Sequence, residues 1–215
     1  TICLSVNKRT NTKVIRKVFT HRSICHREVM TLFKLGKSKF MVDMMNYDTT
    51  HHTRWWYSMP VYSCDAFNYV KKKGFITFES ALKVGACISQ ALDLIHSNNL
   101  VYVDLKLENI FIDDSGIPKL GDMGGVIASN EHVIEYTPST ASPETLIRKV
   151  AYPKSDAWSL GILIMELCQN VKVNVNKLKE MKESCYKLNT ALLIDAVSFD
   201  PKDYGIVNEL IVFDI

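Results

Sequence analysis

The chain has 215 residues, of which 47% are hydrophobic and 23% charged, which is the balance of an ordinary globular protein. This composition excludes a disordered, collagen-like or coiled-coil chain. The formal net charge of +3 is too small to indicate nucleic acid or a membrane surface as the main partner. No apolar run reaches the roughly 18 residues of a membrane span. The sequence therefore predicts a globular protein that binds neither nucleic acid nor membrane.

The basic residues concentrate near the start of the chain. Residues 1–40 hold ten Lys and Arg residues and one acid, Glu28. This pattern fits either a solvated surface or a site for a polyanionic ligand, and the sequence leaves both open. The six cysteines follow no CxxC or Cys/His metal-ligand spacing, which favours reduced thiols and an intracellular protein, either cytoplasmic or nuclear.

Residues 1–60 have the pattern of a small sheet with one helix. Alternating apolar residues predict strands at Ile2–Val6 and Lys13–Phe19, joined as a hairpin. Apolar residues at helical spacing predict a helix over 24–35. Two further strands are predicted, over 41–45 and 55–62.

The pattern changes after Pro60 and becomes mainly helical. A long helix is predicted to open at Thr77 and to close near Ser97. Short strands should follow, over 100–103, 109–112 and 117–120.

Two helices are predicted late in the chain. A nearly continuous apolar segment over 157–168 fits a buried helix, and a Lys- and Glu-rich stretch over 176–187 has helical spacing. Because strands come first and helices afterwards, we predict an α+β fold whose sheet lobe ends near Pro60.

One short polar loop carries three chemically useful side chains. Asp104, Lys106 and Asn109 lie between apolar segments, and Asp122 follows thirteen residues after Asn109. Phosphoryl transfer requires a carboxylate that takes a hydroxyl proton, a lysine near the transferred group, and an Asn and an Asp that hold Mg²⁺. These four residues are therefore candidates for such a site.

The same residues resemble two motifs of eukaryotic protein kinases. The loop that begins at Asp104 looks like their catalytic loop, and Asp122-Met-Gly124 resembles their Asp-Phe-Gly motif. Three more matches follow the family's order and spacing, namely Val14-Ile-Arg-Lys17 for Val-Ala-Ile-Lys, Ser142-Pro-Glu144 for Ala-Pro-Glu, and Asp156-Ala-Trp-Ser-Leu-Gly161 for the start of the family's buried helix.

The resemblance implies a bilobal, kinase-like α+β fold in a single domain over 1–215. A small β-rich N-lobe would occupy 1–60, and a mainly helical C-lobe would occupy 61–215. Lys106, two positions after Asp104, together with Thr137 resembles the serine/threonine branch of the family. The compact sequence is also similar to divergent viral kinases, particularly those of herpesviruses, which would place the protein in a host cell.

The family's catalytic roles carry over to four residues of this chain. Asp104 would orient the substrate hydroxyl and accept its proton, and Lys106 would steady the γ-phosphate of ATP. Asn109 and Asp122 would hold the Mg²⁺ ions. The resemblance thus implies ATP and Mg²⁺ as cofactors and a protein substrate with a Ser or Thr hydroxyl.

The family's nucleotide-binding roles carry over to a second set. Lys17 would hold the α- and β-phosphates of ATP and would be positioned by Glu28. The segment between the lobes would bind adenine through backbone groups of Val61 and Tyr62, with Met59 at the back of the pocket.

The sequence departs from the family pattern in four places. No glycine precedes Gly36, so the Gly-rich loop is missing. Because residue 1 is not Met, the simplest explanation is a fragment that begins just after that loop, and the alternative is a complete chain with weak nucleotide affinity. Tyr102-Val103 stands where the family has His-Arg, so activation through a phosphorylated activation segment is not expected. Met123 replaces Phe, which is a tolerable exchange. No arginine follows Arg148, so either the C-lobe is incomplete or Glu144 has another partner.

Two functions remain open on this evidence. The first is an ATP- and Mg²⁺-dependent protein serine/threonine kinase, favoured because the candidate catalytic and nucleotide-binding residues are all present. The second is a catalytically inactive pseudokinase, a binding module that engages another kinase or its substrate, favoured by the missing Gly-rich loop and by Tyr102-Val103.

Overall fold

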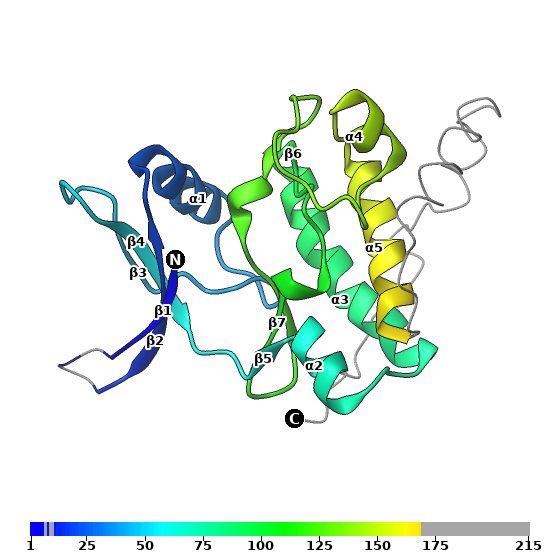
Figure 1. Cartoon of the computed structure of the whole chain (residues 1–215), viewed down its shortest axis with the longest axis horizontal. Helices are drawn as coiled ribbons and strands as arrows, with labels where there is room; N and C mark the ends of the chain where they lie inside the picture. The colour runs from blue at the N-terminus through cyan, green and yellow to red at the C-terminus, as the bar shows by residue number, and fades with distance from the viewer. Residues whose placement is uncertain (7, 9–10, 169–215) are drawn as a thin grey trace.

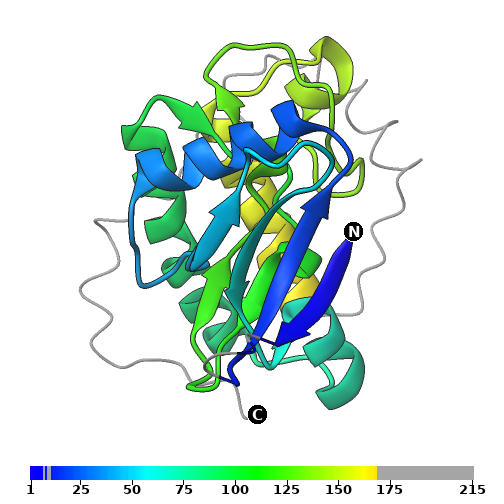
Figure 2. The ribbon, with the colours of Figure 1, turned by 90° about the vertical axis from the view of Figure 1, so that its left-hand side faces the viewer.

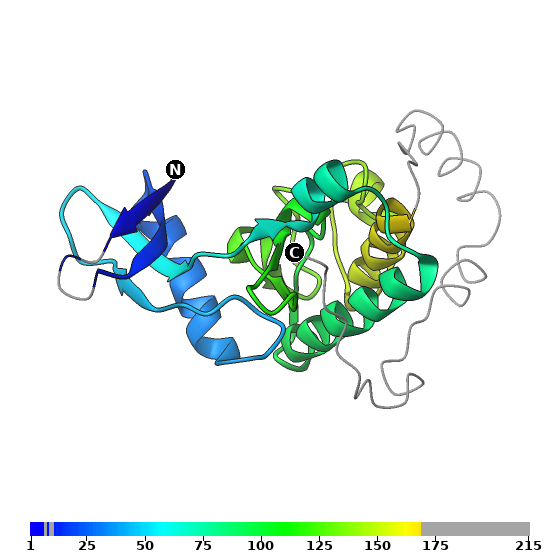
Figure 3. The ribbon, with the colours of Figure 1, turned by 90° about the horizontal axis from the view of Figure 1, so that it is seen from below.

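The structure is a computed structural model that describes residues 1–6, 8 and 11–168. The described chain forms two lobes, a small one built on a sheet and a larger one built mainly on helices (Figure 1). Seen from below, the lobes lie side by side and are joined by the stretch that follows residue 60 (Figure 3). The predicted α+β class and the two-lobed arrangement are thus confirmed.

The small lobe has an antiparallel sheet of four strands, which faces the viewer in Figure 2. The strands run in the order β1-β2-β4-β3. β1 and β2 form the predicted hairpin, and β2 pairs with β4 so that Ile15 faces Met59 and Lys17 faces Tyr57. The strand bounds are β1 Ile2–Val6, β2 Lys13–Phe19, β3 Asn46–Asp48 and β4 Trp55–Pro60.

Helix α1 (Arg22–Leu35) packs against this sheet. It ends where predicted, at Gly36, whose φ of 71° suits glycine and whose N–H donates to the carbonyl of Leu32. Its buried face holds apolar side chains and one acid, Glu28. A charged side chain on the buried face of a helix needs a partner of opposite charge, and Lys17 of the neighbouring strand β2 is that partner.

The strand predicted over 41–45 is wrong. Met41 and Val42 are consecutive and both buried, so neither follows the alternation of a sheet with one solvated face. This segment instead runs along the large lobe, where Val42 N donates to Leu120 O (2.9 Å) and Leu120 N donates to Phe40 O (2.8 Å). The sheet strand lies a few residues later, at β3, and the segment before it attaches the small lobe to the large one.

Two long helices form the centre of the large lobe. In α3 (Phe78–Ser97), Thr77 caps the N-terminus by accepting a hydrogen bond from Ser80 N, as its position predicts. The predicted buried helix is α5 (Pro153–Cys168), which begins four residues earlier than expected. A Cβ atom on Gly85 would lie 2.7 Å from Ile164 Cδ1, so this glycine permits α3 and α5 to approach closely.

The short strands of the large lobe form two small sheets. Three strands form one sheet in the order β5-β7-β8, and two others pair as β6-β9. Their bounds are β5 Cys64–Asp65, β6 Leu100–Val101, β7 Ile110–Ile112, β8 Pro118–Leu120 and β9 Ile127–Ala128, with the 3₁₀ turns η1 Leu107–Asn109 and η2 Met123–Gly125.

Two short helices were not predicted, α2 (Ala66–Lys73) and α4 (Pro143–Arg148). Beside α4, the Ser155 hydroxyl donates a hydrogen bond to Glu144. Glu144 thus has a partner other than a late arginine, which is one of the two alternatives given above. The helix predicted over 176–187 lies outside the described residues. Within the described residues the five cysteines are free thiols, and no helix is long and apolar enough to cross a membrane.

Candidate active site

A buried carboxylate fixes the backbone at the start of the polar loop. Asp156, on α5, is fully buried, and its oxygens accept hydrogen bonds from Tyr102 N and Val103 N, each at 2.8 Å. The His96 ring lies 2.8 Å from the same carboxylate. Val103 has a φ of 74°, a strained conformation for a β-branched residue, which these hydrogen bonds hold in place.

The loop that follows brings four side chains together. Lys106 Nζ donates to Asp104 Oδ2 at 2.6 Å, and the Thr137 hydroxyl donates to Asp104 Oδ1 at 2.6 Å. Lys106 Nζ also lies 3.1 Å from Thr137 Oγ1. The Asn109 amide donates to the Asp104 carbonyl at 2.9 Å. We call Asp104, Lys106, Asn109 and Thr137 the loop cluster, and its carboxylate is held in one orientation from both sides.

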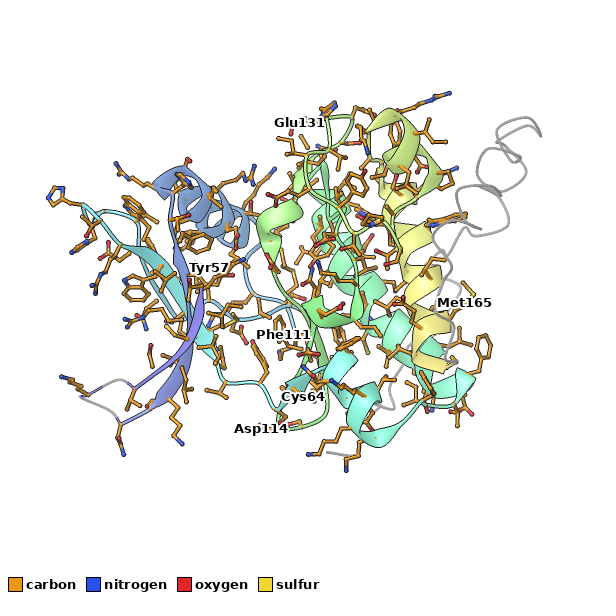
Figure 4. The ribbon with its side chains drawn as sticks, in the orientation of Figure 1. Tyr57, Cys64, Phe111, Asp114, Glu131 and Met165 are labelled. Carbon is orange, nitrogen blue, oxygen red and sulfur yellow. The ribbon has the colours of Figure 1, made fainter. Side chains whose placement is uncertain are left out.

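A second group joins the two lobes. Lys17 Nζ, from β2, lies 3.0 Å from both carboxylate oxygens of Glu28 and 2.8 Å from Asp122 Oδ1 in the large lobe. The Tyr57 hydroxyl donates to Glu28 Oε2 at 3.2 Å, and Figure 4 places Tyr57 beneath α1. We call Lys17, Glu28 and Asp122 the interlobe cluster. The sequence-predicted pairing of Lys17 with Glu28 is therefore present.

The electrostatics of the interlobe cluster reflect two carboxylates that share one ammonium. Burial alone would lower the pKa of Lys17, but Glu28 and Asp122 outweigh it, so this pKa is raised. Burial alone would raise the pKa of Asp122, but the charge and hydrogen bond of Lys17 leave it below its usual value. Burial raises the pKa of Glu28 against the opposing charge of Lys17. The Lys17 ammonium thus lies within ion-pair distance of both carboxylates, one from each lobe.

Glycines after Asp122 let the two clusters adjoin. Asp122 has a left-handed backbone (φ 51°), and its Oδ1 accepts a hydrogen bond from Gly124 N at 3.1 Å. A Cβ atom on Gly124 would lie 3.0 Å from Glu28 Oε1, and one on Gly125 would lie 3.2 Å from Asp104 Cβ. Larger residues there would crowd the acids of both clusters.

The residues predicted to bind adenine lie beside this site. Met59 is buried in β4 opposite Ile15, and Val61 is exposed just after the strand ends at Pro60. The Tyr62 hydroxyl accepts a hydrogen bond from Asp43 N at 3.2 Å, which holds its side chain toward the segment before β3. Their role toward adenine stays a prediction.

The side chains fit a magnesium nucleotide. Asn109 uses its amide N–H₂ on Asp104, which leaves the amide oxygen as its ligand atom, and the pKa of Asp122 keeps that carboxylate ionised. Within the described residues no group of three or more His, Cys, Asp or Glu side chains could hold a metal ion. Mg²⁺ commonly takes one or two protein ligands and completes its shell with phosphate oxygens and water, so these two residues suffice.

Sequence reasoning missed a pair of acids next to the loop cluster. Burial, together with the nearby negative charge of Glu108, raises the pKa of Glu166 to about 7. Glu108 lies in the polar loop and Glu166 on α5, next to Met165, which Figure 4 labels. Only the fold brings them together, because 57 residues (109–165) lie between them in the sequence.

An apolar cavity of about 360 Å³ lies elsewhere, between α3 and α5. Its lining includes Phe78, Leu82, Trp158 and Met165 and none of the residues of the two clusters. A cavity with so little polar lining offers no groups for phosphoryl transfer. The two clusters, and not this cavity, are therefore the candidate active site.

Comparison with known proteins agrees with this geometry. The protein kinase domain family matches residues 1–206. The chain is 28% identical over 177 residues to the serine/threonine-protein kinase US3 homolog of Gallid herpesvirus 2, which covers 77% of this chain and 42% of that protein. It is 33% identical over 123 residues to the human putative serine/threonine-protein kinase PRKY, which covers 55% of this chain and 44% of that protein. The chain thus spans less than half the length of these relatives, and it belongs to the protein kinase family.

Proposed function

We propose that this chain is the catalytic part of a protein serine/threonine kinase, which moves the γ-phosphate of ATP onto a protein hydroxyl with the help of Mg²⁺. The observation that carries the proposal is the juxtaposition of the two clusters: a lysine paired with acids from both lobes lies beside a carboxylate that is oriented by Lys106 and Thr137. The names of the relatives support the same activity.

In this proposal each side chain has one task. Asp104 accepts the proton of the substrate hydroxyl while the hydroxyl oxygen bonds to phosphorus and the bond from phosphorus to the ADP oxygen breaks. Lys106 balances the negative charge of the transferred group, and Lys17 holds the α- and β-phosphates. Asn109 and Asp122 hold Mg²⁺, which supplies neutralisation of charge on the phosphate oxygens.

The acid pair supports a more specific proposal about the acceptor. Burial raises the pKa of Glu166, and the negative charge of Glu108 raises it further, so the two carboxylates repel each other. A Lys or Arg side chain of a substrate would relieve this repulsion and would favour the ionised form of Glu166. We therefore propose that the acceptor segment carries a basic residue near its Ser or Thr. The free thiols of the described residues fit a protein that acts in the cytoplasm or nucleus, in a host cell if it is viral.

The alternative function is a pseudokinase that binds another kinase or its substrate. Val103 favours it, because this residue replaces the arginine that the family uses to sense a phosphorylated activation segment, at a backbone position that is strained. The two functions differ in whether phosphate is transferred.

A transfer assay distinguishes them. The protein is incubated with Mg²⁺ and γ-labelled ATP and with a basic protein as acceptor, beside Asp104→Asn, which keeps the size of the side chain but removes the base. The control is Asp114→Asn, whose carboxylate contacts Ser63 far from both clusters (Figure 4). Transfer that is kept in the control and falls by at least about 100-fold in Asp104→Asn supports the kinase. No transfer in any of the three supports the pseudokinase.

A further inference from the structure

A second apolar cluster lies apart from the main core of the described residues, at the end of the large lobe where α4 lies. Four buried side chains form it and two half-buried ones pack on it. They are Val101, Val103, Val133 and Ala151, with Ile127 and Tyr136. Figure 4 labels Glu131 at this end of the lobe. No task assigned above uses this cluster, which we call the clasp.

The clasp joins the polar loop to the segment that follows Asp122. We call residues 123–142, between Asp122 and α4, the activation segment. Val103 belongs to the start of the polar loop, and Val133 belongs to the activation segment. Val133 N also donates to Lys149 O at 2.8 Å, which ties the segment to the end of α4. The polar loop, the activation segment and the end of α4 therefore meet in the clasp.

Val133 is the anchor of its part of the activation segment. Among residues 130–135 it alone is buried, with 2% of its surface exposed, and the other five residues are exposed. Its neighbour Ile134 is 81% exposed. An isolated buried residue in an exposed stretch fixes that stretch through its own packing, because its neighbours contribute little buried surface. The position of this stretch therefore depends on Val133.

The clasp continues through Tyr136 to the loop cluster. The Tyr136 ring packs on the clasp, and Lys149 Nζ donates to its hydroxyl and lies 4.2 Å from its ring centre. The next residue is Thr137, whose hydroxyl donates to Asp104 Oδ1 at 2.6 Å. Because a planar peptide bond joins Tyr136 to Thr137, the place of the ring limits where the Thr137 hydroxyl can lie. The clasp thus bears on the orientation of the Asp104 carboxylate.

The clasp residues carry no charged side chain. At residue 103 the family has an arginine that senses a phosphorylated activation segment, and this chain has a valine whose surface is 4% exposed. Burial of apolar surface stabilises a contact without any phosphate, as soon as the segment folds. An apolar contact at this place can therefore do what the charged contact does in the family.

We propose that the clasp holds the activation segment in position for phosphate transfer in place of a phosphate group, and that Val133 is a positioning residue that acts on Asp104 through Thr137. The proposal rests on the proposed function, because it uses the task assigned to Asp104. Loss of the Val133 side chain should lower kcat and leave KM for ATP unchanged, because Lys17 and Asp122 keep their contact. Removal of phosphate from the protein should not change the rate.

Cleavage by a glutamate-specific protease tests the clasp without a transfer assay. Glu131 and Glu135 are exposed and flank Val133 in the sequence. Cleavage there requires the segment to leave its place, so its rate reports how often the clasp opens. Val133→Ser leaves a cavity and buries a hydroxyl, and it should speed cleavage at these two sites about tenfold. Val133→Ile and Val6→Ser, the same change at an exposed valine of β1, should stay within about threefold of wild type.

Transfer kinetics on the same preparations test the effect on catalysis. Val133→Ser should lower kcat about tenfold, the loss that corresponds to one hydrogen bond to Asp104, with KM for ATP unchanged. Val133→Ile, which keeps an apolar side chain, should restore kcat, and Val6→Ser should keep the wild-type value. Wild-type protein from which a phosphatase has removed all phosphate, as checked by its mass, should transfer phosphate at the untreated rate.

The outcomes separate this inference from the proposed function. Wild-type cleavage in Val133→Ser overturns the clasp, and faster cleavage with unchanged kcat overturns the positioning role; both leave the kinase proposal standing. A phosphatase treatment that lowers the wild-type rate and speeds cleavage also overturns the clasp, because a phosphate then holds the segment. A wild-type protein that transfers no phosphate overturns the proposed function, and the cleavage rates alone then decide whether the clasp holds the segment.

A second variant covers the case in which Val133→Ser is too unstable to compare. If it melts more than about 10 °C below wild type, Val133→Thr replaces it, because threonine keeps the shape of valine and adds only a hydroxyl. Faster cleavage and a lower kcat in Val133→Thr support the proposal, whereas wild-type values of both contradict it.

Discussion

The two clusters are held together in different ways. The interlobe cluster takes Lys17 and Glu28 from the small lobe and Asp122 from the large one, so its Lys17–Asp122 ion pair exists only while the lobes keep their relative position. The loop cluster takes Asp104, Lys106, Asn109 and Thr137 from the large lobe alone.

The supports of the clusters differ as well. Behind the loop cluster lies Asp156, a fully buried carboxylate that accepts two backbone hydrogen bonds. Behind the interlobe cluster lies Tyr57, which donates one hydrogen bond to Glu28. We infer that damage to the loop cluster's support lowers stability and activity together, whereas damage to the interlobe cluster lowers activity more than stability.

The largest effect is expected from Asp156→Asn. The new amide has one acceptor oxygen in place of two, so its N–H₂ group would face a backbone N–H. Losing a buried, charge-assisted hydrogen bond should lower the free energy of unfolding by about 3 kcal/mol, or about 6–12 °C in melting temperature. A thermal melt beside Asp114→Asn measures this difference. Equal melting temperatures for the two variants would show that Asp156 is not the support of the loop.

A smaller loss of stability is expected from Lys17→Met. Removing the ammonium eliminates its contacts with Glu28 and Asp122, and loss of two charge-assisted hydrogen bonds corresponds to about a 100-fold fall in kcat/KM. Glu28 can take up a proton, because burial already raises its pKa, so stability should fall by only about 1 kcal/mol. Transfer assays and melts on the same preparation measure both. If Lys17→Met melted at a lower temperature than Asp156→Asn, the interlobe cluster would contribute more to stability than the support of the loop cluster, contrary to our inference.

A moderate loss of activity is expected from Thr137→Ala. This change removes the hydroxyl that donates to Asp104 Oδ1 at 2.6 Å and leaves Lys106 as the remaining contact of that carboxylate. Losing one such hydrogen bond should lower kcat about tenfold, and Thr137→Ser should restore it. Steady-state kinetics on the three proteins measure the effect. Failure of the Ser variant to recover would indicate that the methyl group, and not the hydroxyl, is what the site uses.

Much of this architecture could be predicted from the sequence, for reasons visible in particular segments. α3 and α5 have long apolar repeats and a capping Thr77, which depend on neighbouring residues alone. The segment 41–45 was misassigned because its buried residues pack on the other lobe, which no local pattern encodes. Within the candidate site, the order and spacing of the motifs singled out Asp104, Lys106, Asn109 and Asp122, whose catalytic and metal-binding roles stay predictions.

The supports of the site could not be predicted in the same way. Tyr57 contacts Glu28 and Val133 packs with Val103 only after the chain has folded, and each looks like an ordinary core residue in the sequence. Val103 does carry one local signal, because it stands where the family pattern has an arginine.

The smallest effect is expected at Glu166, and it changes with pH. Its folded pKa of about 7 exceeds the ordinary value of 4.5, so its contribution to stability is complete below pH 4.5 and is lost as the pH rises through 7. Glu166→Gln should therefore melt at the same temperature as the wild type at pH 4 and about 2 °C above it at pH 8. The matched control is Glu131→Gln, a change at an exposed glutamate (Figure 4), measured in the same melts.

The same titration should appear in the use of substrate. If a basic side chain of the acceptor lies between Glu108 and Glu166, the wild-type KM for a basic peptide should fall severalfold from pH 6 to pH 8, as Glu166 ionises. Glu166→Gln should flatten this profile and leave KM for ATP unchanged. A profile of the same shape in Glu166→Gln would mean that another group titrates and that the acid pair does not bind the acceptor. A flat profile in Glu166→Gln would show that the preference for basic substrates depends on Glu166, which lies on the same helix as Asp156, the support of the loop cluster.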